Sequence, residues 1–413
     1  MPTRDREPER SGVDTSARAT GAWLEGDDLG ERRLVEVASG RPFSLEAGGR
    51  LSTVEVACET WGTLAEDGSN AILVCHALTG DSHAASAQQP LAAQRGWWHG
   101  LIGPGLAIDT DRWFVVCSNV LGGCQGTTGP ASLDPETGMR YGSSFPLVTI
   151  RDMVRAQAGM AAELGINRWA AVVGGSMGGM QALEWAIMFP QRVGALVAIA
   201  TAGLASAQQI AWSRVGRQAI RLDPAFADGD YYEGHGRGPV DGLGLAREIG
   251  MIHYRSGADF DQRFGRKGLE RVEGFGLWDE FEVARYLGHH GAKIGQRFDA
   301  NSYLVLNRAM DLHDLGRGRG LERAMIRLEA PALIGSIDSD ILYPPHQQAV
   351  LVELLSSLDH DVRSFLINSS AGHDAFLIEI DQVAAAVGPF LDQRAGCGSA
   401  SRHLQPMEVT GDI

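Results

Sequence analysis

One serine lies in a pattern that is typical of enzymatic nucleophiles. The segment Gly174-Gly-Ser-Met-Gly178 follows the apolar run Trp169–Val173 and precedes the largely apolar stretch 179–186. This order predicts a strand, a sharp turn and a helix, with Ser176 at the turn. Glycines on both sides leave room for such a turn. The amide of Met177 would then face an oxyanion that forms at the serine. The sequence therefore predicts that Ser176 is a nucleophile.

A serine nucleophile needs a base, and the base needs a carboxylate that orients it. Where the serine lies on this kind of turn, the three residues follow one another in the order serine, acid, histidine. His373 comes directly after the short apolar run Phe365–Asn368 and is the expected base. Asp338 and Asp340 both follow the run 331–334. Asp340 is favoured as the acid, but aspartate also stabilises turns, so the residues alone leave the choice open.

The second oxyanion donor is expected in the loop after an early central strand. The segment Cys75-His-Ala-Leu-Thr-Gly80 ends such an apolar run and continues with small residues, so the amide of Leu78 is the candidate. His76 precedes the serine, outside the expected order, and is interpreted as structural. The chain has no H-E-x-x-H or related spacing, so no metal is expected.

The elements that must position these residues follow an α/β pattern. Two alternating runs, 33–37 and 53–57, predict an antiparallel meander at one edge of a sheet. Continuous apolar runs, most of them separated by helix-length segments, predict strands that are covered on both faces, as in a mostly parallel sheet between helices. These runs are Ala71–Cys75, Trp113–Cys117, Trp169–Val173, Ala195–Ile199 and Pro331–Ile334, with Phe365–Asn368 as a shorter last strand.

We expect the core of the fold to come from two segments, 23–204 and 326–394. Strand signals disappear in the block 205–325, where helical patterns dominate. A helical insertion at this point would lie above the carboxyl ends of the strands, where ligands bind in open α/β sheets, so the block is predicted to be a lid. The ends, 1–22 and 395–413, lack periodicity and are predicted to be a disordered and a flexible tail.

Composition excludes several classes of partner. The net charge of −15 argues against a nucleic acid or an anionic membrane. The sequence has no apolar stretch of 18 or more residues and no signal-peptide pattern, so we expect a cytoplasmic protein. Its five cysteines include no C-x-x-C pair and fit a reducing compartment.

A series of further motifs runs through the chain from about residue 30 to 390. They are Cys75-His-Ala-Leu-Thr-Gly-Asp81, Trp97-Trp-His-Gly-Leu-Ile-Gly-Pro-Gly105, Asn119-Val-Leu-Gly-Gly-Cys-Gln-Gly-Thr-Thr-Gly-Pro130, Phe145-Pro-Leu-Val-Thr-Ile-Arg-Asp152, Gly174-Gly-Ser-Met-Gly-Gly-Met180, Arg297-Phe-Asp-Ala-Asn-Ser-Tyr303, Ser339-Asp-Ile-Leu-Tyr-Pro344 and Gly372-His-Asp-Ala-Phe-Leu377. In these motifs the chain resembles the homoserine O-acetyltransferase family. The resemblance implies the α/β-hydrolase fold, with a mostly parallel central sheet and an inserted helical lid.

The resemblance also implies roles for individual residues. The family's catalytic aspartate lies in the Ser-Asp-x-Leu segment, which implies that Asp340 is the acid and Asp338 is structural. Arg217 would hold the carboxylate of homoserine through a bidentate pair, and Asp374 would hold its ammonium group. The resemblance further implies acetyl-CoA as co-substrate, no bound cofactor, and a homodimer that forms through the lid.

The implied reaction is a ping-pong acetyl transfer in methionine biosynthesis. Ser176 would take the acetyl group from acetyl-CoA, and the hydroxyl of L-homoserine would then receive it. The alternatives are a homoserine or serine O-succinyltransferase of the same family, a plain serine esterase, and a non-catalytic binding protein. The loop 122–132 is expected to separate the transferases. The turn 316–320 could contact the CoA phosphates, although an exposed Gly/Arg turn is the favoured interpretation.

Overall fold

The computed structural model describes most of the chain, and only these parts are discussed below. The described segments are 18–37, 40–86, 95–234, 236–268 and 276–394. Most of the first predicted tail, 1–17, and the whole of the second, 395–413, therefore lie outside the described residues.

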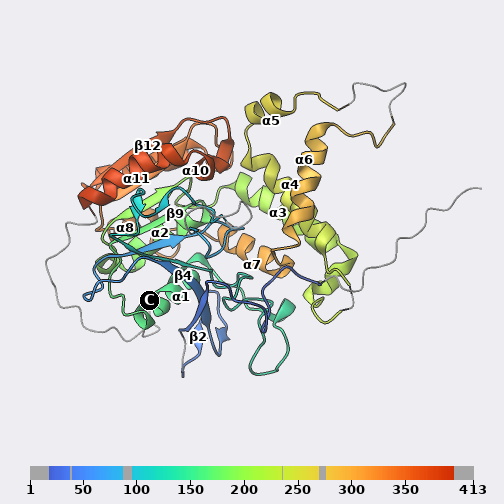
Figure 1. Ribbon diagram of the computed structural model, residues 1–413, viewed down its shortest axis with the longest axis horizontal. Helices are drawn as coiled ribbons and strands as arrows, with labels where there is room; N and C mark the ends of the chain where they lie inside the picture. Colours follow the sequence, from blue (N-terminus) through green and yellow to red (C-terminus); the bar gives the residue numbers. More distant parts are fainter. Residues whose placement is uncertain (1–17, 38–39, 87–94, 235, 269–275, 395–413) are drawn as a thin grey trace, which may run out of the picture.

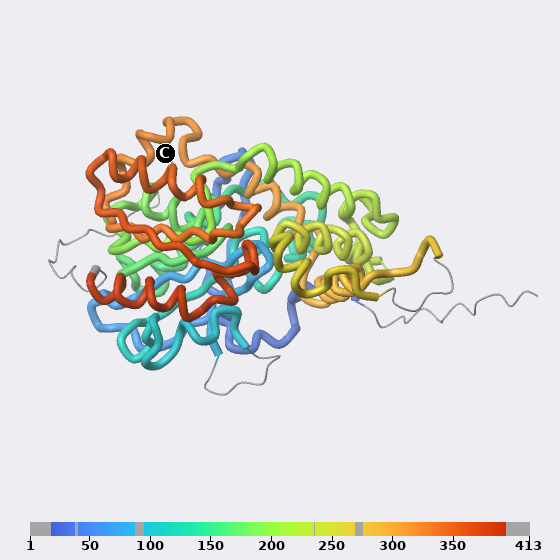
Figure 2. Tube along the Cα trace, turned by 90° about the horizontal axis from the view of Figure 1, so that it is seen from above, coloured from blue at the N-terminus to red at the C-terminus, as the bar shows by residue number. Residues whose placement is uncertain are grey.

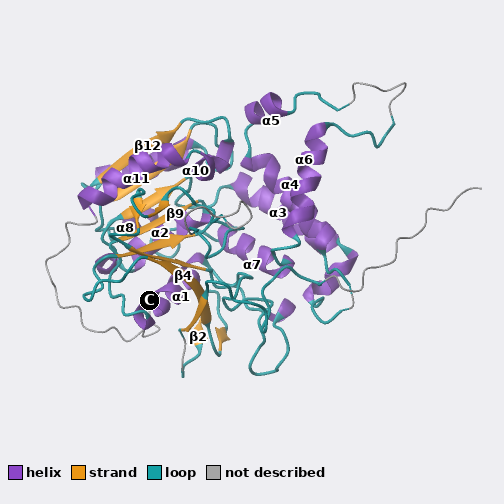
Figure 3. Ribbon diagram, in the orientation of Figure 1, coloured by secondary structure: helices purple, strands orange, loops and turns teal. Residues whose placement is uncertain are grey.

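In the described residues, the centre of the fold is an eight-stranded sheet enclosed by helices (Figure 3). β4 runs antiparallel to both of its neighbours, and all the other neighbouring strands are parallel. This arrangement confirms the predicted meander at the sheet edge and the mostly parallel sheet. The strands, in spatial order, are β1 (Arg33–Glu36), β4 (Glu55–Trp61), β8 (Phe114–Ser118), β5 (Ala71–Cys75), β9 (Ala171–Gly175), β10 (Leu196–Ile199), β11 (Ala332–Ile337) and β12 (Val362–Ile367).

The inner strands are apolar throughout because helices cover both faces of the sheet. Every residue of β5, β8, β9 and β10 is buried. One face packs against α1 (Ile150–Glu163), α2 (Met177–Met188) and α9 (Pro345–Ser357). The other face packs against α11 (Ile380–Arg394) and the segment around Trp98. Burial on both faces removes the need for alternation and explains the continuous apolar runs.

Several strands differ from their predicted limits, and for β9 and β12 the difference has a clear physical reason. β9 was expected at Trp169–Val173 but is shifted by two residues and includes Gly174 and Gly175. These glycines resemble turn residues in the sequence, yet they belong to the strand. Both positions are glycine because close neighbours leave no space for a side chain. β12 begins at Val362, ahead of the predicted 365, and its polar residues are tolerated because it is an edge strand.

Between β10 and β11 the described chain carries helices and no named strand. Figures 1 and 2 both place α3, α4 and α6 at one end of the sheet, and α8 contacts α9 of the core. The role of this block as a lid stays a prediction. Its helices are α3 (Ala207–Leu222), α4 (Val240–Tyr254), α5 (Gly257–Arg263), α6 (Glu282–Ile294), α7 (Ala300–Asp311) and α8 (Leu321–Met325).

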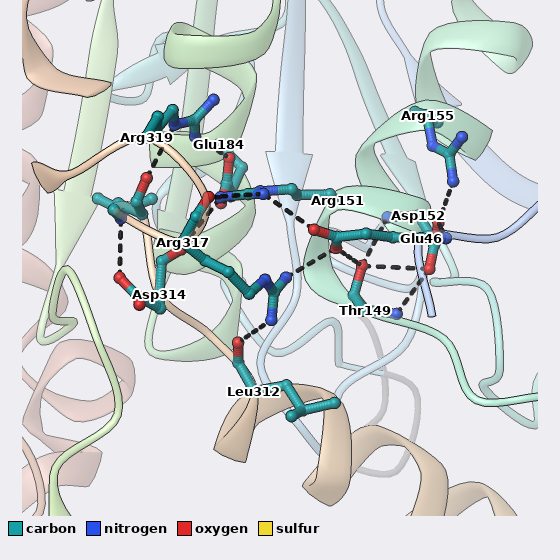
Figure 4. Close-up of polar contacts among 12 residues, drawn as sticks. Glu46, Thr149, Arg151, Asp152, Arg155, Glu184, Leu312, Asp314, Arg317 and Arg319 are labelled. Atoms are coloured by element: carbon teal, nitrogen blue, oxygen red, sulfur yellow. Dashed lines mark hydrogen bonds and ion pairs between the residues drawn. The ribbon is translucent and has the colours of Figure 1, made fainter. Parts of the chain in front are cut away.

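An ion-pair network fastens α1 and α2 to the turn after α7 (Figure 4). Glu184 of α2 is 1% exposed and pairs with Arg151 at 2.9 Å and with Arg319 at 3.2 Å. Glu46 pairs with Arg151 at 2.9 Å and with Arg317 at 2.7 Å. Burial raises the pKa of Glu184, and the two arginines counteract that rise. Both arginines of the turn 316–320 thus bind carboxylates of the protein itself.

We predict that Glu184→Gln lowers the free energy of unfolding by about 3–5 kcal/mol, because it leaves two partly buried guanidinium groups without their shared carboxylate. Urea unfolding followed by tryptophan fluorescence measures the change. Asp392→Ala is the matched control. It removes an ion pair with Arg112 in which both side chains are more than half exposed, so its cost is expected to be less than about 1 kcal/mol. Equal effects of the two variants would contradict the prediction.

Candidate active site

Ser176 lies on a strained turn between β9 and α2. Its φ of 58° and ψ of −124° are unusual for a residue with a side chain. The turn is held by a hydrogen bond from the amide of Ser176 to the carbonyl oxygen of Ile199 at 2.9 Å. A Cβ on Gly175 would lie 2.5 Å from the Phe376 ring, and one on Gly178 would lie 2.0 Å from the carbonyl oxygen of Cys75. Glycine at both positions is therefore a steric requirement.

The three residues predicted as a triad are in hydrogen-bond contact. His373 Nε2 lies 2.9 Å from Ser176 Oγ, and His373 Nδ1 lies 2.7 Å from Asp340 Oδ2. Because Nδ1–H donates to the carboxylate, Nε2 is left to accept the serine proton. Asp338 is exposed and accepts a hydrogen bond from the amide of Ser369 at 3.0 Å. The structure thus brings Asp340, and not Asp338, to the histidine.

The other carboxylate oxygen of Asp340 is fixed by the backbone. Asp340 Oδ1 accepts hydrogen bonds from the amides of Leu342 and Tyr343 at 2.8 and 2.9 Å. Asp340 and His373 are 3% and 4% exposed. Burial acts to lower the pKa of His373, but the charge and hydrogen bond of Asp340, with a contribution from Asp374, outweigh it and raise that pKa above its ordinary value of 6.5. Such an imidazole is a stronger base than a free one.

The two amides predicted to bind an oxyanion lie in loops that meet. Met177 begins α2, and Leu78 follows β5, whose carboxyl end touches the backbone at Gly178. Within the described chain, neither the Met177 nor the Leu78 amide donates to another protein group. Leu78 also lines a cavity with Tyr254 and Tyr343. The centres of these two rings lie 6.0 and 5.2 Å from the centre of the His373 ring. Free amides beside a cavity can bind developing negative charge.

The structure does not bring Arg217 into contact with Asp374. Arg217 pairs with Asp311, which is 2% exposed, at 2.6 Å, and it donates to Asn307 at 2.5 Å. Asp374 pairs instead with Arg255 at 3.4 Å. Burial raises the pKa of Asp374, and the nearby positive charges counteract that rise. The guanidinium group of Arg217 thus has a protein carboxylate as its partner, and its role in binding homoserine stays a prediction.

Arg247 of α4 faces the site, and the sequence reasoning missed it. Its guanidinium carbon lies 5.4 Å from the centre of the Tyr254 ring, and Nη1 lies 3.4 Å from Thr79 Oγ1. Its charge also acts to lower the pKa of Asp374. Among the described residues, no carboxylate forms an ion pair with Arg247. The available signal was an arginine inside the largely apolar helical run Leu243–Tyr254.

The described residues contain no group of three or more histidine, cysteine, aspartate or glutamate side chains arranged to hold a metal ion. Within the same segments, none of the helices has both the length and the apolar character that crossing a membrane requires.

Comparison with known proteins gives consistent matches over most of the chain. A family model described as alpha/beta hydrolase fold matches residues 70–379. A homoserine O-acetyltransferase from Thermobifida fusca (strain YX) is 52% identical over 379 residues, which cover 91% of this chain and 97% of that protein. Two solved structures are similar at TM-scores of 0.82 and 0.81. A homoserine O-acetyltransferase from Bacillus anthracis is 30% identical and matches over 88% of this chain and 98% of that one. Esterase E22 is 31% identical and matches over 87% of this chain and 99% of that one.

The raised pKa of His373 predicts the pH dependence of serine acylation. The imidazole must be neutral to accept the Ser176 proton, so the rate rises with pH and its midpoint lies above 6.5. Asp340→Asn removes the main charge that raises this pKa and leaves the lowering effect of burial with the smaller contribution of Asp374, so the midpoint moves to lower pH. The plateau rate falls about 10⁴-fold because the histidine also loses its orientation. The burst of p-nitrophenol from p-nitrophenyl acetate, measured between pH 5 and 9, reports both quantities. An unchanged midpoint in the variant would refute this account.

Proposed function

The chain belongs to the homoserine O-acetyltransferase family of the α/β-hydrolase fold, and we propose that it transfers acetyl from acetyl-CoA to the hydroxyl of L-homoserine. The observation that carries the mechanism is the contact of Ser176 Oγ with His373 Nε2 at 2.9 Å, with Asp340 behind the histidine. An acyltransferase that works through such a serine forms a covalent intermediate and follows ping-pong kinetics.

In the first half-reaction His373 takes the proton of Ser176, and the serine oxygen attacks the thioester carbonyl of acetyl-CoA. The amides of Leu78 and Met177 stabilise the tetrahedral oxyanion in this proposal; both are free of protein acceptors in the described residues. The carbon–sulfur bond then breaks. The sulfur leaves as the CoA thiol with the proton from His373, and the acetyl group stays on the serine. The protein needs no bound cofactor for this chemistry.

In the second half-reaction the homoserine hydroxyl gives its proton to His373 and attacks the carbonyl carbon of the acetyl-serine. The bond between this carbon and Ser176 Oγ then breaks, His373 returns the proton to the serine oxygen, and O-acetylhomoserine leaves. Homoserine carries a carboxylate and an ammonium group, so its site needs one charge of each sign. We assign the carboxylate to Arg247, because this guanidinium lies over Tyr254 beside His373 and forms no ion pair in the described chain. Asp374 receives the ammonium group, as the family resemblance implied. The proposed role thus moves from Arg217 to Arg247.

Hydrolysis of acetyl esters is the second candidate function, because esterase E22 is 31% identical to this chain. The triad alone serves both reactions, since water and homoserine attack the same acyl-serine. Transfer requires that the acceptor be positioned and water excluded. The helical block 205–325 supports transfer, since it contributes Arg247 and lines the cavity with Trp212, His253 and Tyr303.

The proposal also covers the metabolic pathway, the oligomeric state and the cellular location of the protein. An O-acetylated homoserine serves methionine biosynthesis, as the resemblance implied. We further propose a cytoplasmic homodimer that forms through the helical block. Leu277 and Trp278 in this block are 86% and 87% exposed and offer it apolar surface.

The first prediction from this proposal concerns the acyl acceptor. With acetyl-CoA and L-homoserine we expect rapid release of CoA thiol, and without an acceptor only a burst of about one equivalent per subunit. Thiol titration with a disulfide reagent measures both. Faster release from succinyl-CoA would overturn the choice of acyl donor, and faster release with serine than with homoserine would overturn the choice of acceptor. Steady release of thiol without any acceptor would indicate a hydrolase. Ser176→Ala is the control and is expected to abolish the burst.

The second prediction separates the two arginines. Arg247→Lys keeps the charge but loses the planar fork that pairs with a carboxylate, so the KM for homoserine should rise roughly tenfold or more. The acetyl-CoA burst should stay unchanged, because it precedes homoserine binding. Arg217→Lys is the matched control and should change this KM less than about twofold, since its partner is Asp311 of the protein. The opposite pattern would restore the carboxylate role to Arg217.

A further inference from the structure

The loop after β5 contains a buried histidine that the acyl-transfer mechanism does not use. His76 is 2% exposed, and both of its ring nitrogens have backbone partners. Nε2 lies 3.1 Å from the amide nitrogen of Val120, and Nδ1 lies 2.8 Å from the carbonyl oxygen of Ala77. The Val120 amide can only donate, so Nε2 accepts and carries no proton. The ring proton is therefore on Nδ1, from which it is donated to Ala77.

Neither nitrogen of His76 is available to a substrate. A protonated ring would lose the bond from Val120, and burial lowers the pKa of His76, which also favours the neutral ring. His76 is thus a fixed, neutral hydrogen-bond donor rather than a second catalytic base. What matters is the group to which it donates.

The carbonyl of Ala77 and the amide of Leu78 belong to the same peptide unit. A trans peptide is planar, and its C=O and N–H point in opposite directions, so fixing one fixes the other. The Ala77 oxygen is held by two donors: His76 Nδ1 at 2.8 Å and the Gly80 amide at 2.9 Å. The Leu78 N–H consequently points away from the His76 ring.

We infer that His76 is a positioning residue for the oxyanion site: its Nδ1–H holds the Ala77 carbonyl and thereby aims the Leu78 amide at the carbonyl oxygen of the acyl group. This inference rests on the proposed acyl-transfer function and assigns a further residue to the same site. The donated hydrogen bond also polarises the peptide, which makes the Leu78 N–H a better donor.

Gly80 provides an independent sign that this arrangement is sterically fixed. A Cβ at Gly80 would lie 3.0 Å from His76 Cβ, 3.3 Å from the Ala77 oxygen and 3.4 Å from His76 Nδ1. Its φ is not positive, so the backbone conformation does not call for glycine. Glycine is favoured here because the His76 ring and the Ala77 carbonyl lie so close to this position. A side chain here would push apart the two groups whose contact orients Leu78.

A second buried contact ties this loop to the other oxyanion donor. Gln181 Nε2 donates to the carbonyl oxygens of His76 and Met177, both at 3.2 Å. The direction of this amide is set by its neighbours: Trp185 Nε1 donates to Gln157 Oε1 at 2.8 Å, and Gln157 Nε2 donates to Gln181 Oε1 at 2.8 Å. Since the Trp185 indole can only donate, each amide in the series has one orientation. The two loops are therefore held together as one rigid unit.

Two substitutions at His76 separate its two hydrogen bonds. His76→Asn keeps a donor near the position of Nδ1 and loses the acceptor for Val120, whereas His76→Gln keeps that acceptor and loses the donor to Ala77. We expect His76→Gln to lower the acylation rate constant by tenfold to a hundredfold, part of the loss seen when an oxyanion donor is removed. His76→Asn should stay within about threefold of the wild type. The dissociation constant of acetyl-CoA, taken from the concentration dependence of the burst rate, should not change in either variant.

The acylation burst with p-nitrophenyl acetate measures this rate constant and needs no homoserine. Inhibition by a trifluoromethyl ketone, which forms an oxyanion on Ser176, provides the second readout and should weaken in His76→Gln by the same factor. Should His76→Gln not fold, Gly80→Ala replaces it, because it disturbs the same contact and should lower the same rate constant.

Equal losses in His76→Asn and His76→Gln, or a slower burst with unchanged inhibition, would overturn the positioning role. So would a His76→Gln or Gly80→Ala enzyme with the wild-type burst. These results are distinct from a failure of the proposed function. In that case the wild type itself would not acetylate homoserine, whatever its variants do.

Discussion

The close approach of two backbone segments, the end of β5 and the start of α2, is the constraint on which the site depends. β5 and β9 are parallel neighbours, and Cys75 is paired with Gly174, so the loops that leave them begin side by side. A Cβ at Gly178 would lie 2.0 Å from the Cys75 oxygen, which means that the loops touch through backbone alone. This contact places the loop that carries Leu78 beside the start of α2, where Met177 follows the serine.

The same constraint explains why so much of the buried polar structure lies behind the serine. Two backbones in contact leave carbonyl groups that no strand can pair, and buried polar groups need partners. Gln181 donates to the carbonyl oxygens of His76 and Met177, and His76 donates to that of Ala77, which also accepts from the Gly80 amide. Further along α2, Glu184 fixes the helix to Arg151 and Arg319. The helix that begins with Met177 is thus anchored along its length, which keeps the turn in its strained conformation.

The sequence predicted the residues whose positions follow from strand ends. Ser176, Asp340 and His373 each come after a strand of a parallel sheet, and parallel strands bring their carboxyl ends to one edge. Arg217 and Arg247 lie on helices of the insertion, where no such rule applies. Helical periodicity indicates which face is apolar, but not which helix lies opposite. The ion pair of Arg217 with Asp311, for example, is a contact between α3 and α7 that only the three-dimensional packing reveals.

In the proposed function the core supplies the triad, the two amides and Asp374, and the insertion supplies Arg247. A triad and two amides on a rigid sheet can form an acyl-serine from many activated acyl groups, and they do not distinguish water from an alcohol. Discrimination needs groups that are satisfied only when the correct acceptor is bound. Arg247 carries a charge without a protein ion-pair partner in the described chain, and Asp374 has only Arg255, at 3.4 Å. A zwitterionic amino acid supplies a partner for each, and water supplies neither. In the proposed function, selectivity for transfer over hydrolysis follows from charges that the free enzyme leaves incompletely paired.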